Sequence, residues 1–80
     1  MSDTEKRLVR CFSLVFSTLS PEQIRTASVE SVPGWDSLAT ITLVALLEQE
    51  FGVKIDLLDL PELGSFEAMR NFVVRHESNG

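Results

Sequence analysis

The residues of this chain that could take part in covalent chemistry are few: Ser37, Cys11 and the single histidine, His76. Ser37 follows a Pro-Gly pair that breaks the chain, and Asp36 before it can cap the first free amides of a helix. Ser37 is thus expected in a helix's first turn, where unpaired N–H groups and the helix dipole favour an anion. The position suits a serine that carries a phosphate ester.

Other chemistries find less support. Hydrolysis through Ser37 needs a base, and His76 lies close to the C-terminus. Cys11 falls on an apolar helix stripe, which is typical of a core residue rather than a reactive thiol. One cysteine and one histidine give no metal-ligand spacing, and the sequence has no glycine-rich phosphate loop. We therefore expect no catalytic residues and no metal, but a handle that enzymes modify and read.

Length and composition limit the possible architectures. Eighty residues suffice for one domain, residues 1–80, with one thin core. No apolar run reaches the roughly 18 residues of a membrane span, and the charged start does not resemble a secretory leader. A single cysteine fits a reducing compartment. We expect a cytoplasmic monomer without membrane insertion.

The charge is concentrated in one part of the chain. Residues 30–67 contain eight acids and only one base, Lys54, whereas the flanks are weakly basic. This distribution argues against nucleic acid and for partners with basic docking patches. The alternative, that the acids only keep a small domain soluble, stays open. The acids are Glu30, Asp36, Glu48, Glu50, Asp56, Asp59, Glu62 and Glu67.

Two helix-start patterns precede the serine. The S-x-x-E capping box at residues 2–5 predicts a helix to about Leu19, with Leu8, Phe12 and Val15 on its apolar stripe. Ser20, followed by a proline, opens one short turn. Residues 26–36 lack a period, so we expect a long connection pinned by three apolar side chains, with Trp35 in packing rather than ligand contact. These are Val29, Val32 and Trp35.

The second long helix should run from Asp36 or Ser37 to Phe51 and end at Gly52. Its core face is expected to hold Thr40, Leu43, Val44, Leu47 and Phe51. More apolar residues remain than one face needs, and a domain this small cannot cover them all. The flank beside Ser37 is therefore a candidate partner-binding surface. It comprises Leu38, Ile41, Ala45 and Glu48 at its edge, next to the capping Asp36.

The remainder of the chain predicts two more elements. Residues 53–55 form a linker that inserts Ile55, and residues 56–63 a short irregular helix limited by Pro61. Ser65 caps a last helix from Phe66 to about His76. Its apolar positions are Phe66, Met69, Phe72, Val73 and Val74. The predicted fold is all-α, a four-helix bundle with three main helices, a short third helix and a long loop between helices 1 and 2.

These features resemble the acyl carrier proteins of the phosphopantetheine-attachment family. The resemblance is carried by Trp35-Asp36-Ser37-Leu38, the L-x-x-x-L-E-x-x-F-x-x-x-I pattern from Leu43 to Ile55, and the last helix from Ser65 to Val73. It implies a 4′-phosphopantetheine arm, derived from coenzyme A, on Ser37. The arm would carry acyl or related groups as thioesters between enzymes. Implied partners are a phosphopantetheinyl transferase and acyl- or aminoacyl-loading and transfer enzymes.

The sequence also departs from the fatty-acid carriers that it resembles. Those usually have further acids after the serine, whereas this chain has Ala39 and Thr42. We therefore favour a specialised, stand-alone carrier of a polyketide, lipid, polysaccharide or amino-acid pathway over a fatty-acid elongation carrier. The alternative is a small helical interaction module without a prosthetic group, in which Ser37 is only a helix residue.

Overall fold

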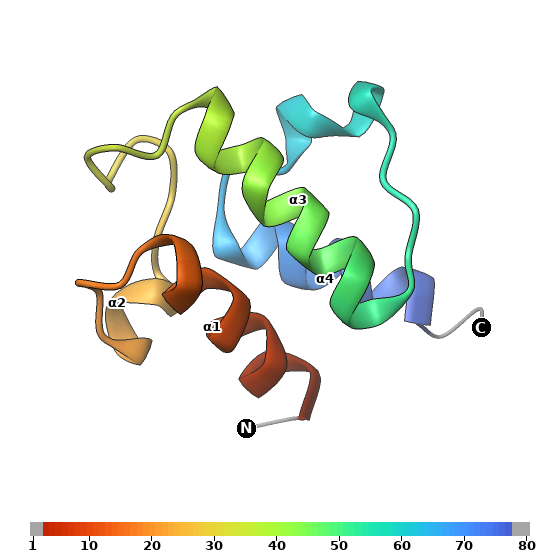
Figure 1. Cartoon of the computed structure of the whole chain (residues 1–80), viewed down its shortest axis with the longest axis horizontal. Coiled ribbons are helices and arrows are strands. Elements are labelled where there is room, and N and C mark those ends of the chain that lie inside the picture. Colours follow the sequence, from red (N-terminus) through yellow and green to blue (C-terminus); the bar gives the residue numbers. More distant parts are fainter. Residues whose placement is uncertain (1–2, 78–80) are drawn as a thin grey trace.

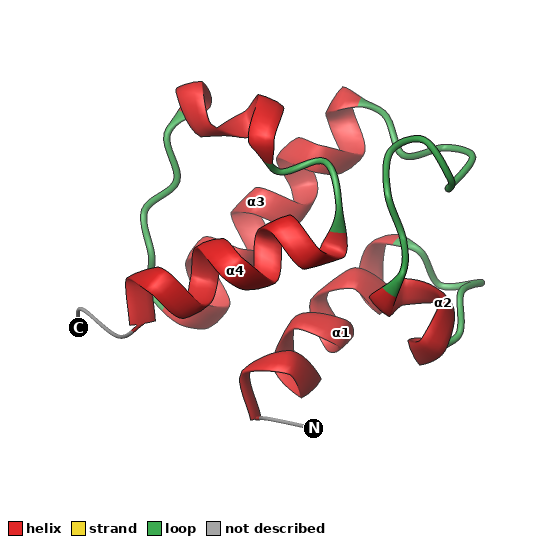
Figure 2. Cartoon of the chain, turned by 180° about the vertical axis from the view of Figure 1, so that it is seen from behind, coloured by secondary structure: helices red, strands yellow, loops and turns green. Residues whose placement is uncertain are grey.

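The computed structural model describes residues 3–77. Three long helices, α1, α3 and α4, surround the core, while the short α2 lies in the connection before α3 and a short 3₁₀ helix, η1, in the connection after it (Figure 1). Figure 2 shows the same arrangement from behind, with loops joining the helices. This confirms the predicted all-α class. The bounds are α1 Asp3–Val15, α2 Pro21–Arg25, α3 Ser37–Phe51, η1 Leu57–Glu62 and α4 Phe66–Glu77.

Helix α3 begins and ends where its sequence predicts. The Asp36 carboxylate accepts a hydrogen bond from the amide of Ala39 at 2.9 Å. At the other end Gly52 has a φ of +66°, a left-handed conformation that glycine adopts without a Cβ clash. Thr40, Leu43 and Leu47 of this helix are buried. The expected core face is confirmed, with Val44 and Phe51 half-buried at its edges.

Aromatic rings form the centre of the core near the start of α3. The ring of Phe12, from α1, lies 5.6 Å from Trp35 and 5.2 Å from Phe66, in edge-to-face arrangements that aromatic pairs prefer. The ring of Phe16 also packs against Trp35, with 5.4 Å between the ring centroids. Trp35 is therefore a packing residue, as expected. It joins the connection before α3 to α1.

The end of α1 differs from the expectation. The helix stops at Val15 rather than near Leu19, and residues 17–19 form a turn. The amide of Phe16 still bonds to the Phe12 carbonyl, after which the chain turns with Phe16 against the indole of Trp35. The helix thus ends at this tertiary contact, although the apolar pattern of the sequence continues to Leu19. The predicted cap at Ser2 lies outside the described residues.

The long connection is held to the start of α4 by backbone hydrogen bonds. The amide of Val29 bonds to the Gly64 carbonyl at 2.8 Å, and the amide of Phe66 to the Ala27 carbonyl at 3.1 Å. Of the three apolar residues expected to pin the connection, Val32 and Trp35 are buried, whereas the side chain of Val29 is 45% exposed. The backbone hydrogen bond of Val29 to Gly64 fixes the loop at this point. Among the apolar positions expected on the last helix, Val74 is exposed, whereas the other four are buried.

Arg7 fastens the far end of α3 to α1. Its Nε lies 2.7 Å from Glu50 Oε2, and its Nη2 donates to the Glu50 carbonyl at 2.6 Å. The guanidinium also lies 4.6 Å from the centre of the Phe51 ring. A cation at a helix C-terminus complements the negative end of the dipole. One acid of the acidic region, Glu50, therefore has an internal partner.

Candidate functional site

Ser37 is the first residue of α3, and its side chain is exposed. The first intrahelical bond runs from the Thr40 amide to the Asp36 carbonyl at 3.0 Å, so the amides of Ser37 and Leu38 precede the helical ladder. The hydroxyl therefore lies at the positive end of a 15-residue helix. An anionic adduct on this oxygen finds favourable electrostatics and open space.

The other serines of the described residues are mostly engaged. Five of them use their hydroxyls in hydrogen bonds: Ser13, Ser20, Ser28, Ser31 and Ser65. Within residues 3–77, Ser17 and Ser37 are the serines for which the structure gives the hydroxyl no such bond. Ser17 lies in a turn, whereas Ser37 opens a long helix. Ser37 is thus the serine that combines a free hydroxyl with a helix start.

Next to Ser37 is a hollow of about 320 Å³, which we call the η1 hollow. Its wall is mostly apolar, and half of it comes from η1 and half from the first two turns of α3. The lining residues are Ser37, Thr40, Ile41, Leu57, Leu60 and Pro61. The sequence alone did not predict that η1 lies next to Ser37, because this proximity depends on the path of residues 52–56. The one feature of the sequence that could have indicated this hollow is Leu57, an apolar residue that the core does not require.

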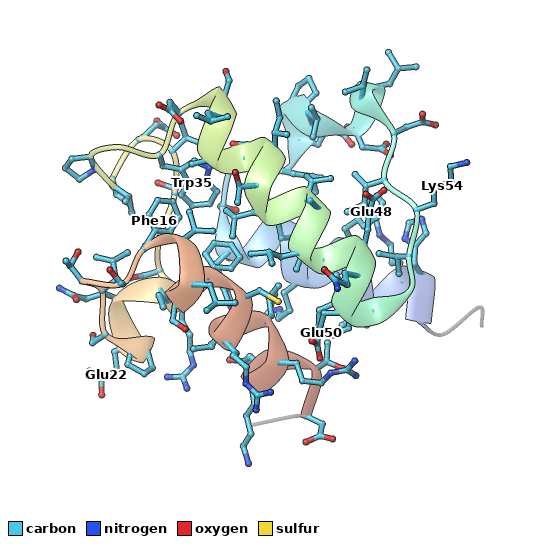
Figure 3. The ribbon with its side chains drawn as sticks, in the orientation of Figure 1. Phe16, Glu22, Trp35, Glu48, Glu50 and Lys54 are labelled. Atoms are coloured by element: carbon cyan, nitrogen blue, oxygen red, sulfur yellow. The ribbon has the colours of Figure 1, made fainter. Side chains whose placement is uncertain are left out.

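The predicted partner flank lies on the surface of α3. Leu38 is 72% and Ile41 51% exposed, and Ala45 is exposed as well. Glu48 is different, since it lies beside the connection that follows α3 (Figure 3), and its Oε2 accepts a hydrogen bond from the Ile55 amide at 2.9 Å. Glu48 therefore fixes the path of the chain into η1, and its other oxygen is left for solvent or a partner.

His76 does not approach the serine. Its Nδ1 lies 2.8 Å from the Phe72 carbonyl, and its ring stacks on Phe72 at 4.0 Å. The end of α4 lies next to the C-terminal end of α3 in both views, whereas Ser37 opens the opposite end (Figures 1 and 2). The structure therefore does not pair Ser37 with His76. Among residues 3–77, no group of three histidine, cysteine or acidic side chains is arranged to hold a metal ion, and each helix there is too short or too polar to cross a bilayer.

The comparison with known proteins agrees with this geometry. A protein-family model described as "Phosphopantetheine attachment site" matches residues 8–73 of the 80-residue chain. The match runs from α1 to α4 and has the Asp36–Ser37 helix start near its middle. Domains of this family are sites of covalent 4′-phosphopantetheine attachment and are generally non-catalytic carriers. The free hydroxyl, the open helix start and the adjoining hollow fit such a group, and the chain belongs to the phosphopantetheine attachment family.

Proposed function

We propose that Ser37 is the attachment residue, and that the protein holds acyl or related groups as thioesters and delivers them between enzymes of a biosynthetic pathway. The observation that carries this proposal is the exposed Ser37 hydroxyl, without an internal hydrogen bond, at the start of α3. The arm, when bound, supplies a thiol at its end for thioester formation. The domain itself supplies an anchor and a surface that other enzymes read.

Loading is a substitution at phosphorus. The Ser37 oxygen forms a new P–O bond with the phosphate that bears the pantetheine in coenzyme A, and the pyrophosphate bond breaks. Adenosine 3′,5′-bisphosphate leaves, while the hydroxyl proton passes to a base of the phosphopantetheinyl transferase. Within this chain, the helix start favours the negative charge of the resulting phosphodiester.

The surface around Ser37 suggests the kind of partner. The helix from Ser37 to Leu47 contains no charged side chain, and Leu38 and Ile41 are exposed on it. Exposed Asp36 directly precedes α3, and exposed Asp56 directly precedes Leu57 of the η1 hollow, so both are available to basic patches of loading and transfer enzymes. We propose that the partner face consists of Asp36, Leu38, Ile41, Ala45 and Glu48. The lack of acids along its centre supports a specialised carrier rather than a fatty-acid elongation carrier.

The attachment is tested by incubating the protein with coenzyme A and a broad-specificity phosphopantetheinyl transferase. Intact mass should increase by one phosphopantetheine, and fragmentation should locate the adduct on the peptide that contains Ser37. An adduct on another serine would contradict the assignment. No adduct at all, with a carrier of known competence loaded in parallel, would favour the helical interaction module without a prosthetic group.

The partner face leads to a prediction for Leu38 and Ile41. Replacing both by Ala should lower kcat/KM for loading by about tenfold, because the few central contacts that dominate an interface each cost more than about 1 kcal/mol when truncated. Stability should change little, because both side chains are largely exposed. Leu14→Ala is the matched control, since Leu14 is 69% exposed on α1. Equal rates in the double variant and the control would place the docking surface elsewhere.

Loading can also be followed by thiol chemistry. Burial, aided by the charge of Glu50, raises the pKa of the Cys11 thiol, so little reactive thiolate forms near neutral pH. We expect iodoacetamide at pH 7 to modify the native unloaded protein very slowly and the loaded protein once, on the arm. Denaturing the unloaded protein should expose Cys11 to the reagent. Fast labelling of the native unloaded protein would show that Cys11 is not protected.

A further inference from the structure

The indole of Trp35 makes one polar contact, a hydrogen bond to a residue in the first turns of α3. Trp35 is 3% exposed and packs against the rings of Phe12 and Phe16, the latter beside it in Figure 3. Its Nε1 donates a hydrogen bond to Thr40 Oγ1 at 2.8 Å. Thr40 is itself buried, one turn after Ser37. The indole therefore links α1, the long connection and α3.

Thr40 in turn forms hydrogen bonds to the peptide group that precedes Ser37. Its hydroxyl donates to the Asp36 carbonyl at 3.2 Å, and its amide donates to the same oxygen at 3.0 Å. The Asp36 amide in turn bonds to the Gly34 carbonyl at 3.1 Å. Because a peptide unit is planar, a fixed Asp36 carbonyl also fixes the direction in which the Ser37 backbone leaves it. The chain of bonds thus ends one bond from the residue to be modified.

Besides the Asp36 carboxylate that caps the Ala39 amide, the first turn of α3 has little packing to restrain it. Ser37 and Leu38 are exposed, Ala39 is only partly buried, and Thr40 is the first buried residue of the helix. We propose that Trp35 and Thr40 are positioning residues, which orient the Ser37 hydroxyl for transfer of the phosphopantetheine. This rests on the proposed attachment at Ser37. Substitution at phosphorus needs the attacking oxygen in line with the leaving oxygen, so a small misorientation lowers the rate.

Three substitutions separate this role from packing alone. Thr40→Val replaces the hydroxyl by a methyl group of similar size and removes both side-chain hydrogen bonds. Thr40→Ser keeps the hydroxyl and removes the methyl group. Trp35→Phe keeps a buried aromatic ring but removes the indole donor. If only packing matters, Thr40→Ser should be the more harmful change at Thr40, whereas a positioning role requires the opposite order.

The experiment measures initial rates of loading with coenzyme A and a broad-specificity phosphopantetheinyl transferase, by intact mass, at a temperature where circular dichroism shows every variant folded. Thr40→Val and Trp35→Phe should each lower kcat by about tenfold and leave KM for the carrier within about twofold. Thr40→Ser should retain the wild-type kcat. The double variant of Trp35→Phe and Thr40→Val should lose no more than the worse single change, because both remove the same hydrogen bond.

Two results would overturn the inference: a wild-type kcat for folded Thr40→Val or Trp35→Phe, or an equal loss in Thr40→Ser and Thr40→Val. If Thr40→Val does not fold, the kcat of Trp35→Phe decides between the outcomes. Failure of the wild-type protein to be loaded has a different meaning, since it would reject attachment at Ser37 itself. The two proposals therefore fail in distinguishable ways.

Discussion

Replacing Ser37 by Ala should abolish covalent loading completely and leave the fold intact. The substitution removes the one oxygen that would form the phosphodiester, so the mass gain expected of the wild-type protein should be missing at any transferase concentration. Stability should change little, because Ser37 is exposed and its hydroxyl makes no hydrogen bond within the described residues. Intact mass after prolonged incubation and thermal unfolding by circular dichroism measure the two properties.

Ser17→Ala is the matched control for this experiment. Ser17 is the other described serine with an exposed hydroxyl and no internal hydrogen bond, but it lies in the turn after α1. Its variant should be loaded at the wild-type rate. Residual loading of Ser37→Ala, or loss of loading in Ser17→Ala, would show that Ser37 is not the attachment residue. A large loss of stability in Ser37→Ala would make the missing adduct uninformative about attachment.

The boundaries of α3 were predictable because the signals for them are local. Asp36 caps the helix through its own side chain, and Gly52 ends it through its own φ angle. The exposure of Leu38 and Ile41 followed from counting apolar residues against the small core. The position of Ser37 needed no tertiary information, since a helix start defines it. Most of the candidate site could thus be predicted from residues 33–52.

Predictions that depended on distant contacts were less successful. The early end of α1 depends on the contact between Phe16 and Trp35, which are far apart in sequence. The backbone bond of Val29 to Gly64, which holds the connection to the start of α4, is not encoded in the periodicity of the sequence. The η1 hollow needs the connection that Glu48 fixes through the Ile55 amide. In each case the deciding partner lies on another element, so a local pattern could not name it.

The structure shows that several acids of residues 30–67 are engaged within the protein. Sequence charge alone suggested acids available to basic partners, but Glu50 is paired with Arg7, and Glu48 and Asp59 accept backbone hydrogen bonds. Charge along the chain is therefore a poor measure of charge offered to a partner. The surface of α3 between Ser37 and Leu47 is uncharged and partly apolar. Docking at Ser37 should accordingly depend less on salt than the net charge suggests.

Replacing Leu47 by Ala should leave the domain barely folded. Leu47 is completely buried on the core face of α3, and truncating such a leucine typically costs about 2 to 5 kcal/mol. At about 0.05 to 0.15 kcal/mol per residue, 80 residues have a total stability of roughly 4 to 12 kcal/mol. The loss is thus a large part of the whole, and urea denaturation followed by circular dichroism should show a much lower midpoint.

Ile41→Ala is the matched control for Leu47→Ala, because it removes methylene and methyl groups of similar size from the same helix. Ile41 is 51% exposed and leaves little cavity, so its free energy of unfolding should fall by only about 1 kcal/mol or less. The order of the two losses tests the assignment of the two faces of α3. If Ile41→Ala destabilises the domain as much as Leu47→Ala, then the flank beside Ser37 belongs to the core, and it cannot be the surface that partners read.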